Sequence, residues 1–294
     1  MKVLITGAGG MLGKDVYELM SKDDNFQVYP LDKHPLPHPN AIELDITLDR
    51  DVVLAKIAEI DPEVIIHCAA YTDVKWCEQT NNHEATDKLH VNATSVIASH
   101  NSAKFIYIST DSVFDGKLGN YEEDAATSPI TYYAKSKLKG EIAALKANTN
   151  TLIIRTNIYG FHIPPRLNSF FVDGALNKLQ TKEIIKGYDN IYVNFIYTKQ
   201  LARIINKLLK TELKGTLNVA SKENMSKYEF LLKLAKVFGC DQALINKQPA
   251  PPAQNPGNTS LNINKLKKLL GEEPSIDDGL QMLKEDMTNI GLIK

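Results

Sequence analysis

Tyr133 and Lys137 stand four residues apart in the stretch "TYYAKSK", residues 131–137. On a helix, residues at this spacing share a face, whereas Tyr132 is paired at that distance only with Ser136. A free tyrosine titrates near ~10, and a lysine charge ~4–5 Å away can lower its pKa by roughly 3 units at an effective dielectric of ~20. The spacing therefore favours Tyr133 as a proton donor whose pKa Lys137 lowers. A helix with a packed aromatic ring and a solvated lysine would show the same spacing.

A hydroxyl side chain precedes this pair at the end of a predicted strand. Thr110 closes the apolar run "FIYIS" and stands 23 residues before Tyr133. In open α/β sheets, ligands bind outside the carboxyl ends of the strands. We therefore expect Thr110 to donate a hydrogen bond to a substrate carbonyl oxygen.

A glycine-rich loop follows the first predicted strand. The sequence "TGAGGMLG" places Gly7, Gly10 and Gly13 at three-residue intervals, and Leu12 distinguishes it from the GxGxxG pattern. Glycines let backbone N–H groups approach a pyrophosphate at the start of the following helix. The strand–loop–helix context predicts a dinucleotide site, and a glycine-rich turn without a ligand is the alternative.

Two charged residues at the end of the second predicted strand bear on the choice of cofactor. Asp32 favours NAD, because an acidic residue here binds the adenosine ribose hydroxyls, whereas Lys33 favours the 2′-phosphate of NADP. The sequence leaves this preference open and predicts NADPH or NADH. Asp45 and Ile46, in "ELDIT", could face the adenine, although a surface turn is an alternative for Asp45.

Short apolar segments alternate with longer amphipathic segments in the first half of the chain, which predicts a doubly wound parallel α/β sheet of the Rossmann type. The expected strands are Val3–Thr6, Gln27–Leu31, Glu63–Cys68, Lys104–Thr110 and Thr151–Thr156. The expected helices are Met11–Met20, Asp49–Ile60, Asn82–Ser102 and Tyr132–Ala147.

The alternation changes after about residue 156, where we expect a smaller substrate-binding domain. The expected division is 1–156, with about 191–220 returning to it, against 157–190 and 221–294. Predicted helices in this part are Ser169–Gln180, Lys199–Lys210, Lys227–Phe238 and Ile276–Ile290, with strands Glu183–Lys186 and Thr216–Ala220. The Pro-rich segment 247–258 is expected to be a loop.

Composition excludes several classes of protein. With 43% hydrophobic and 23% charged residues, the chain is typical of globular proteins, and its net charge of −1 favours neither nucleic acid nor an anionic membrane as a partner. No signal peptide, membrane span or metal motif is apparent, and the cysteines Cys68, Cys77 and Cys240 lack CxxC spacing. We expect a cytoplasmic protein without a metal centre.

Five motifs carry a resemblance to a known family: "TGAGGMLG", "CAAYTDVKWCE", "STDSVFDG", "SPITYYAKSKLKGE" and "NPGNTSLN". They span residues 6–262. The chain resembles the extended short-chain dehydrogenases/reductases, and within them the dTDP-4-dehydrorhamnose reductases. The resemblance implies an NAD(P)H-dependent reductase of a nucleotide-linked 4-keto-6-deoxy sugar, acting as a monomer or homodimer.

The resemblance also implies roles for individual residues. Tyr133 is similar to the family's proton donor, Lys137 to the lysine that holds the nicotinamide ribose, and Thr110 to the carbonyl-binding hydroxyl. Further cofactor contacts are implied for Gly7, Gly10, Met11, Leu12, Cys68, Ala69, Ala70, Thr72 and Asn92. For Asn92, a role in helix packing is an equal alternative.

Four departures from the family pattern fall on the expected substrate side. Ser112 replaces a tyrosine beside Asp111, Lys75 and Trp76 stand in an altered loop, Asn157 lies in a shortened "RTNIYG" that lacks a tryptophan, and Asn255 replaces an arginine. We expect these residues to bind a changed sugar, although Trp76 and Tyr159 could restore the same pocket. The alternatives are an epimerase or dehydratase and a non-catalytic, NADP-binding regulatory subunit; Asp111 lacks the following glutamate that a dehydratase favours.

Overall fold

The computed structural model describes residues 1–100, 103–163, 171–251 and 256–293, which form two compact units. Unit 1 comprises 1–113, 127–155 and 202–217, and unit 2 comprises 114–126, 156–201 and 218–294. The predicted division differs from these units at four places, 114–126, 156, 191–201 and 218–220, all of which belong to unit 2. For the first segment the cause is pairing at long range: the Tyr121 N–H donates to the Ser260 carbonyl oxygen at 2.9 Å.

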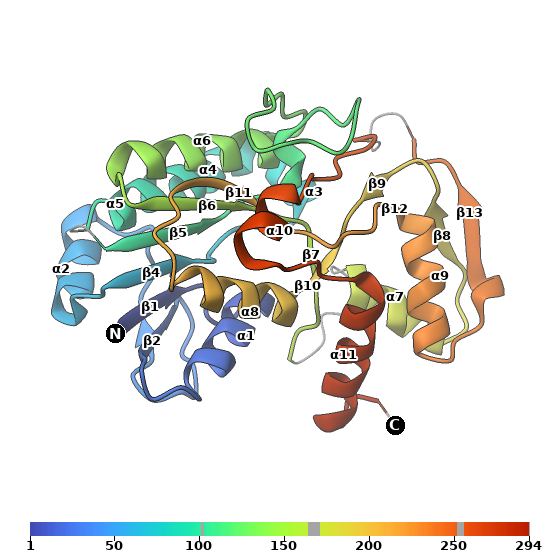
Figure 1. The fold of residues 1–294 in the computed structure, drawn as a ribbon, viewed down its shortest axis with the longest axis horizontal. Coiled ribbons are helices and arrows are strands. Elements are labelled where there is room, and N and C mark those ends of the chain that lie inside the picture. Colours follow the sequence, from blue (N-terminus) through green and yellow to red (C-terminus); the bar gives the residue numbers. More distant parts are fainter. Residues whose placement is uncertain (101–102, 164–170, 252–255, 294) are drawn as a thin grey trace. The chain divides into compact units, whose positions relative to one another are not determined.

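Unit 1 is built on a seven-stranded sheet with the order β11-β6-β5-β4-β1-β2-β3 (Figure 1). The pairings from β3 across to β6 are all parallel. This is the Rossmann arrangement, in which the strand order reverses beside the first strand and helices cover both faces of the sheet. The strands are β1 (Lys2–Thr6), β2 (Gln27–Asp32), β3 (Ile42–Glu43), β4 (Val64–His67), β5 (Lys104–Ile108), β6 (Thr151–Arg155) and β11 (Gly215–Asn218).

The predicted helices of unit 1 are present with one exception, and the short helix α3 was not predicted. The expected single helix Asn82–Ser102, whose last two positions lie outside the described residues, is divided into α4, a π-helical turn at Lys88–Ala93, and α5. Such π-helical turns often occur at functional sites. The helices are α1 (Met11–Met20), α2 (Arg50–Ile60), α3 (Val74–Cys77), α4 (His83–Asp87), α5 (Thr94–Ala98) and α6 (Tyr132–Ala147).

Apolar residues on one face of this sheet form a core with α2, α5 and α6. Leu4, Ile65, Phe105 and Ile153 come from four neighbouring strands and pack in one buried cluster with side chains of these helices. α1, which connects β1 to β2, lies on the opposite face (Figure 1). Covering on both faces explains why the strand sequences are apolar without alternation.

Unit 2 contains two-stranded sheets and helices around a second core. β10 pairs with β7, β12 with β9, and β13 with β8. β13 lies partly in the segment 247–258 that the sequence predicts as a loop, because its partner β8 is sixty residues earlier and gives no local signal. The elements are β7 (Ile158–Tyr159), α7 (Phe171–Gln180), β8 (Ile185–Tyr188), β9 (Tyr192–Val193), β10 (Ile196–Tyr197), α8 (Thr198–Leu208, which continues into unit 1), β12 (Met225–Ser226), α9 (Lys227–Val237), β13 (Ile245–Gln248), α10 (Asn264–Leu270) and α11 (Ile276–Asn289).

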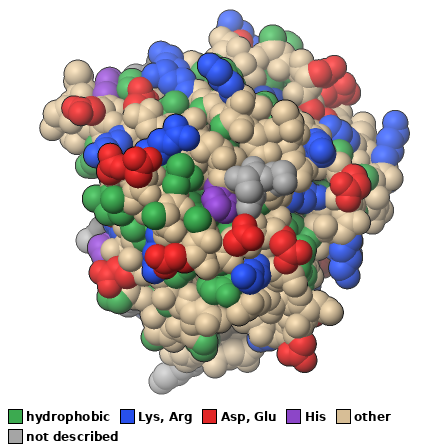
Figure 2. Space-filling model, turned by 90° about the vertical axis from the view of Figure 1, so that its left-hand side faces the viewer, with side chains coloured by type: hydrophobic (Ala, Val, Ile, Leu, Met, Phe, Trp, Pro, Cys, Tyr) green, Lys and Arg blue, Asp and Glu red, His purple; other side chains and the backbone are tan. Residues whose placement is uncertain are grey.

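Charged side chains of both signs are interspersed on the face of the molecule that Figure 2 presents. This distribution agrees with the net charge of −1. No helix among the described residues is long and apolar enough to cross a membrane.

A buried ion pair fixes α6 to the central strands of unit 1. Arg155, at the end of β6, donates from Nε to Glu141 Oε1 at 3.0 Å and from an Nη to Oε2 at 2.8 Å. Ser109, directly after β5, donates its hydroxyl to the same carboxylate. Glu141 and Arg155 are only 3% and 6% exposed, so each charge depends on the other for its stabilisation.

We expect Glu141→Leu to lower the free energy of unfolding by about 3–5 kcal/mol, because it leaves the Arg155 guanidinium buried without its carboxylate. The double variant Glu141→Leu, Arg155→Leu should lose less, since it buries no unpaired charge. Urea unfolding of the three proteins measures the difference. Additive losses in the double variant would show that the pair contributes no coupling.

Candidate cofactor and catalytic site

The glycine loop has the backbone geometry that phosphate binding requires. Gly7 has φ +66°, and a Cβ built there would lie 2.7 Å from the Ala69 nitrogen; at Gly13 it would lie 2.3 Å from the Gly7 carbonyl oxygen. Gly10 is the N-cap of α1, and no side chain caps this helix start in the described chain. The loop therefore presents uncapped backbone N–H groups at the positive end of a helix, which suits an anionic phosphate.

Asp32, at the end of β2, points toward this loop. Its carboxylate accepts the Gly9 N–H at 3.0 Å and the His34 N–H at 3.2 Å. Lys33 is exposed, with its ammonium nitrogen 5.9 Å from the centroid of the Tyr71 ring. The acidic and the basic side chain therefore both stand where a cofactor ribose is expected, and the preference between NADH and NADPH stays open.

The two residues expected near the adenine take structural positions. Asp45 caps a surface turn, where its carboxylate accepts the N–H of Thr47 at 2.8 Å and the hydroxyl of Thr47 at 2.7 Å. Burial alone would raise the pKa of Asp45, but these bonds and the charges of Lys33 and Lys88 lower it overall. Ile46 is 6% exposed and belongs to the core cluster under the sheet. The structure thus favours the surface turn for Asp45. For Ile46, the burial of the side chain argues against a contact with the cofactor.

The segment after β4 lies against the glycine loop. The close approach of Gly7 to Ala69 brings the expected cofactor residues Cys68, Ala69 and Ala70 beside it. These three are partly buried and Thr72 is exposed. Burial raises the pKa of the Cys68 thiol to about 12, so this wall of the site carries no thiolate at neutral pH.

Thr110, Asp111 and Tyr133 meet at the carboxyl end of β5. Thr110 donates its hydroxyl to Asp111 Oδ1 at 3.1 Å, and Ser112 donates to the same oxygen at 3.2 Å. Burial raises the pKa of Tyr133 well above its ordinary value, and the Asp111 charge adds to this, while a hydrogen bond with Thr110 opposes it. The two hydroxyls expected to bind a carbonyl oxygen are therefore neighbours.

Lys137 shares the helix face of Tyr133 and is buried. Its ammonium donates to the Ile108 carbonyl oxygen at 2.7 Å and lies 4.0 Å from the centroid of the Tyr107 ring. Burial lowers the pKa of Lys137 to about 7, against the attraction of Glu141. The expectation that Lys137 lowers the pKa of Tyr133 is not met in this structure, because burial is the largest cause of both shifts: it raises the pKa of Tyr133 and lowers that of Lys137.

Tyr132 points to a different set of residues. Its ring stacks on His83 at 3.4 Å between centroids, and the Lys139 ammonium lies 5.6 Å from its centroid. Its backbone N–H donates to the carboxylate of Glu78. The two tyrosine side chains thus leave α6 in different directions, and of the two it is Tyr133 that lies beside Thr110.

The expected substrate residues are divided between the units. Trp76 packs on Tyr71 with 4.6 Å between ring centroids, while Lys75 beside it on α3 is exposed. Asn157 belongs to unit 2, and Asn255 lies outside the described residues. Tyr159 is 2% exposed in the core of unit 2, which argues against it as a surface for a sugar.

Sequence reasoning selected Asn92 in the π-helical turn, but Asn92 is exposed, whereas the polar side chain of His90 in the same turn is buried. His90 contacts the Tyr133 ring edge-on at 5.9 Å between centroids. His67, at the end of β4, is a second buried histidine, bonded to Thr6 and Thr94. The lone histidine in "LHVNAT" shows no motif spacing, so only the fold reveals its neighbours.

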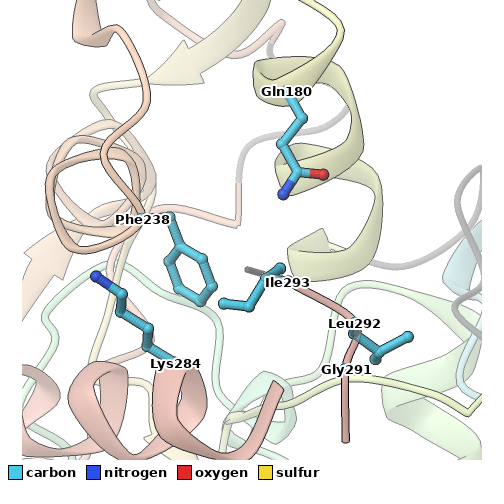
Figure 3. A pocket seen from close by; sticks show the side chains of 6 residues that line it. All are labelled: Gln180, Phe238, Lys284, Gly291, Leu292 and Ile293. Carbon is cyan, nitrogen blue, oxygen red and sulfur yellow. The ribbon is translucent and has the colours of Figure 1, made fainter. Parts of the chain in front are cut away.

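A hollow in unit 2 has none of this chemistry. Figure 3 shows the residues that line it: Lys284, the one charged residue among them, lies within α11, and the others lie at or just after the ends of α7, α9 and α11. None of its residues was expected in the site; they are Gln180, Phe238, Lys284, Gly291, Leu292 and Ile293. Within the described ranges, no group of three or more His, Cys, Asp or Glu side chains is placed to hold a metal ion.

Comparison with known proteins identifies the family. Residues 1–288 match the family described as "RmlD substrate binding domain". The chain belongs to this family. The match confirms the resemblance to dTDP-4-dehydrorhamnose reductases and, at the level of the family, the predicted class of oxidoreductase.

The proteins that this chain resembles have names that indicate different functions. The chain is 29% identical to a dTDP-4-dehydrorhamnose reductase from Bacillus anthracis solved in complex with NADP, with a TM-score of 0.84, covering 97% of this chain and 99% of that one. It is 29% identical to a probable low-salt glycan biosynthesis reductase of Haloferax volcanii, over 97% of each chain. It is also 30% identical to methionine adenosyltransferase 2 subunit beta of Bos taurus, over 91% of this chain and 82% of the relative.

The two buried histidines predict how the stability of the protein depends on pH. Burial, with the nearby charge of Lys137, lowers the pKa of His67 to about 3 and that of His90 well below its ordinary value. An unfolded histidine titrates near ~6.5, so below that pH the unfolded chain binds protons that the folded chain does not. The free energy of unfolding should therefore fall below about pH 6.5, by up to roughly 1.4 kcal/mol per pH unit for each histidine.

Urea unfolding at about pH 7.5 and about pH 5.5 tests this dependence. His67→Gln should reduce the slope, whereas His34→Gln, at an exposed position, should leave it unchanged. Equal free energies of unfolding at both pH values would contradict the burial of neutral histidines.

Proposed function

We propose that this chain is an NAD(P)H-dependent reductase of a nucleotide-linked 4-keto-6-deoxy sugar. The observation that carries the proposal is the meeting of Thr110 and Tyr133 at the carboxyl end of β5, with Lys137 one helical turn beyond Tyr133. The family match and the reductases among the solved and curated relatives support the same reaction class.

The residues present fit a dinucleotide. The uncapped start of α1 and the close glycine backbone would hold the pyrophosphate, with Asp32 and Lys33 beside the adenosine ribose and Cys68–Ala70 along the nicotinamide half. Lys137 would hold the nicotinamide ribose. When bound, the reduced nicotinamide supplies a hydride to the keto carbon.

Side chains of the protein supply the hydrogen-bond donors and the proton that the reaction needs. As hydride is added, negative charge grows on the keto oxygen, and the hydroxyls of Thr110 and Tyr133 stabilise it by hydrogen bonding. Tyr133 then transfers its phenolic proton to that oxygen, which becomes the product hydroxyl. The buried ammonium of Lys137 stabilises the resulting phenolate. A raised pKa keeps Tyr133 protonated until the oxyanion forms.

The departures from the family pattern support a sugar other than dTDP-4-dehydrorhamnose as the preferred substrate. The ring of Trp76 is engaged with Tyr71, and Tyr159 is buried in a core, so neither supports a simple replacement of the lost tryptophan. Ser112 is held by Asp111. Each altered contact is of a kind that changes specificity by about 1–3 kcal/mol.

A non-catalytic regulatory subunit is the second candidate, because a relative at 30% identity is named as a subunit of methionine adenosyltransferase. The arrangement of Thr110, Tyr133 and Lys137 favours the reductase. A regulatory subunit would bind the cofactor without consuming it, which separates the two functions experimentally.

We expect Tyr133→Phe to lower kcat by ~10²-fold or more while NADPH affinity is kept, because it removes the transferable proton and leaves the ring in place. Tyr132→Phe is the matched control and should change kcat far less, since Tyr132 stacks on His83. Steady-state kinetics of both variants measure the effect. A larger loss in Tyr132→Phe would reverse the assignment.

A panel of nucleotide 4-keto sugars, each with NADPH and NADH, tests the function through loss of nicotinamide absorbance. We expect at least one member to reach the usual enzyme range of kcat/KM, ~10⁴–10⁸ M⁻¹s⁻¹, and dTDP-4-dehydrorhamnose to react only in trace. Efficient reduction of dTDP-4-dehydrorhamnose would contradict the changed sugar but not the reductase. Cofactor binding without reduction of any member would favour the regulatory subunit.

A further inference from the structure

His90 occupies an unusual place in unit 1. It lies in the π-helical turn between α4 and α5 and is 1% exposed, although histidine is polar at both ring nitrogens. α6 packs closely on this turn: a Cβ added at Gly140 would lie 2.4 Å from the His90 carbonyl oxygen. A buried polar ring at such a close contact must have both nitrogens bonded.

The first bond fixes the tautomer of the ring. His90 Nε2 accepts the backbone N–H of Tyr71 at 2.9 Å. A nitrogen that accepts this bond carries no proton, so in the neutral ring the proton is on Nδ1. A charged ring would place two N–H groups against each other, in agreement with a pKa of His90 that burial and Lys137 hold well below its usual range.

The second bond leads to the proposed acid. Nδ1 is 2.8 Å from the Ser136 hydroxyl oxygen and donates to it, because that hydroxyl in turn donates to the Tyr133 carbonyl oxygen at 2.7 Å. His90 also contacts the Tyr133 ring edge-on. One side chain is thus joined to the first turn of α6 on one side and to the segment after β4 on the other.

We propose that His90 is a positioning residue. It fixes the segment 68–72, called here the cofactor wall, relative to the acid Tyr133. It does so through hydrogen bonds that run from the Tyr71 N–H through His90 and Ser136 to the Tyr133 carbonyl oxygen. The proposal rests on the reductase function, since Tyr133 is the acid and 68–72 is the cofactor wall. The ring acts through backbone groups and exchanges no proton with the substrate.

The two hydrogen bonds of the His90 ring can be removed separately by substitution. Nδ1 is bonded to Cγ, so Asn at position 90 can place its amide N–H near Ser136 but cannot reach the Tyr71 N–H. Gln is one bond longer, so its amide oxygen can accept the Tyr71 N–H while the bond to Ser136 is lost. Each variant removes one of the two hydrogen bonds and keeps the other, so the two losses can be told apart by what they change.

We expect His90→Asn to weaken NADPH binding by about 3- to 10-fold, the loss of one hydrogen bond, with kcat little changed. His90→Gln should lower kcat about 10- to 100-fold through displacement of Tyr133, with NADPH affinity little changed. Ser136→Ala should lower kcat as His90→Gln does. Ser136→Thr keeps the hydroxyl and should have a kcat close to that of the wild-type protein. His100→Gln, at the end of α5, is the control and should change neither.

Isothermal titration with NADPH and steady-state kinetics on the best sugar of the panel separate these effects. The ¹⁵N shifts of the wild-type histidines give a readout that needs no turnover and no variant: His90 should show a proton on Nδ1 and not titrate between about pH 5 and about pH 8.

A proton on Nε2, titration near the ordinary histidine pKa, or equal losses in the Asn and Gln variants would overturn the positioning role. If the wild-type chain reduces no sugar, the reductase function fails. The tautomer and the NADPH affinities still decide whether His90 holds the cofactor wall, so the two failures are distinguishable.

Discussion

The buried carboxylate of Glu141 is the constraint on which the active arrangement of unit 1 depends. A charge this deeply buried is tolerated only with a partner of opposite sign and further hydrogen-bond donors, and Arg155 and Ser109 supply them from β6 and β5. The pair fixes the rotation of α6 about its axis. Tyr133, Ser136 and Lys137 all lie on this helix, so their directions follow from that one rotation.

Exclusion of water gives the neighbourhood of α6 its chemical character. The same burial keeps His67 and His90 neutral, raises the pKa of Tyr133 and lowers that of Lys137. An uncompensated charge is therefore costly in this neighbourhood.

The relatives illustrate why the site has to be argued separately from the fold. Proteins named as sugar reductases and as a subunit of an adenosyltransferase match nearly the whole chain at similar identity. A Rossmann sheet with a glycine loop predicts a dinucleotide site and does not by itself predict a reaction. The proposed reaction therefore rests on a few side chains at the strand ends of unit 1 and not on the fold.

The sequence by itself determined the parts that rest on local patterns. Apolar runs gave the strands of the parallel sheet, the glycine spacing gave the loop before α1, and the four-residue spacing of Tyr133 and Lys137 gave their shared face, since each signal lies within a few residues. Tertiary structure decided what depends on distant partners: the burial of Ile46, the pairing of β13 with β8, and the assignment of 114–126 to unit 2. It also decided the direction of the Tyr133 pKa and the partners of His90. Burial and hydrogen bonding between residues tens of positions apart leave no periodic trace in the sequence, and only the folded chain brings those groups together.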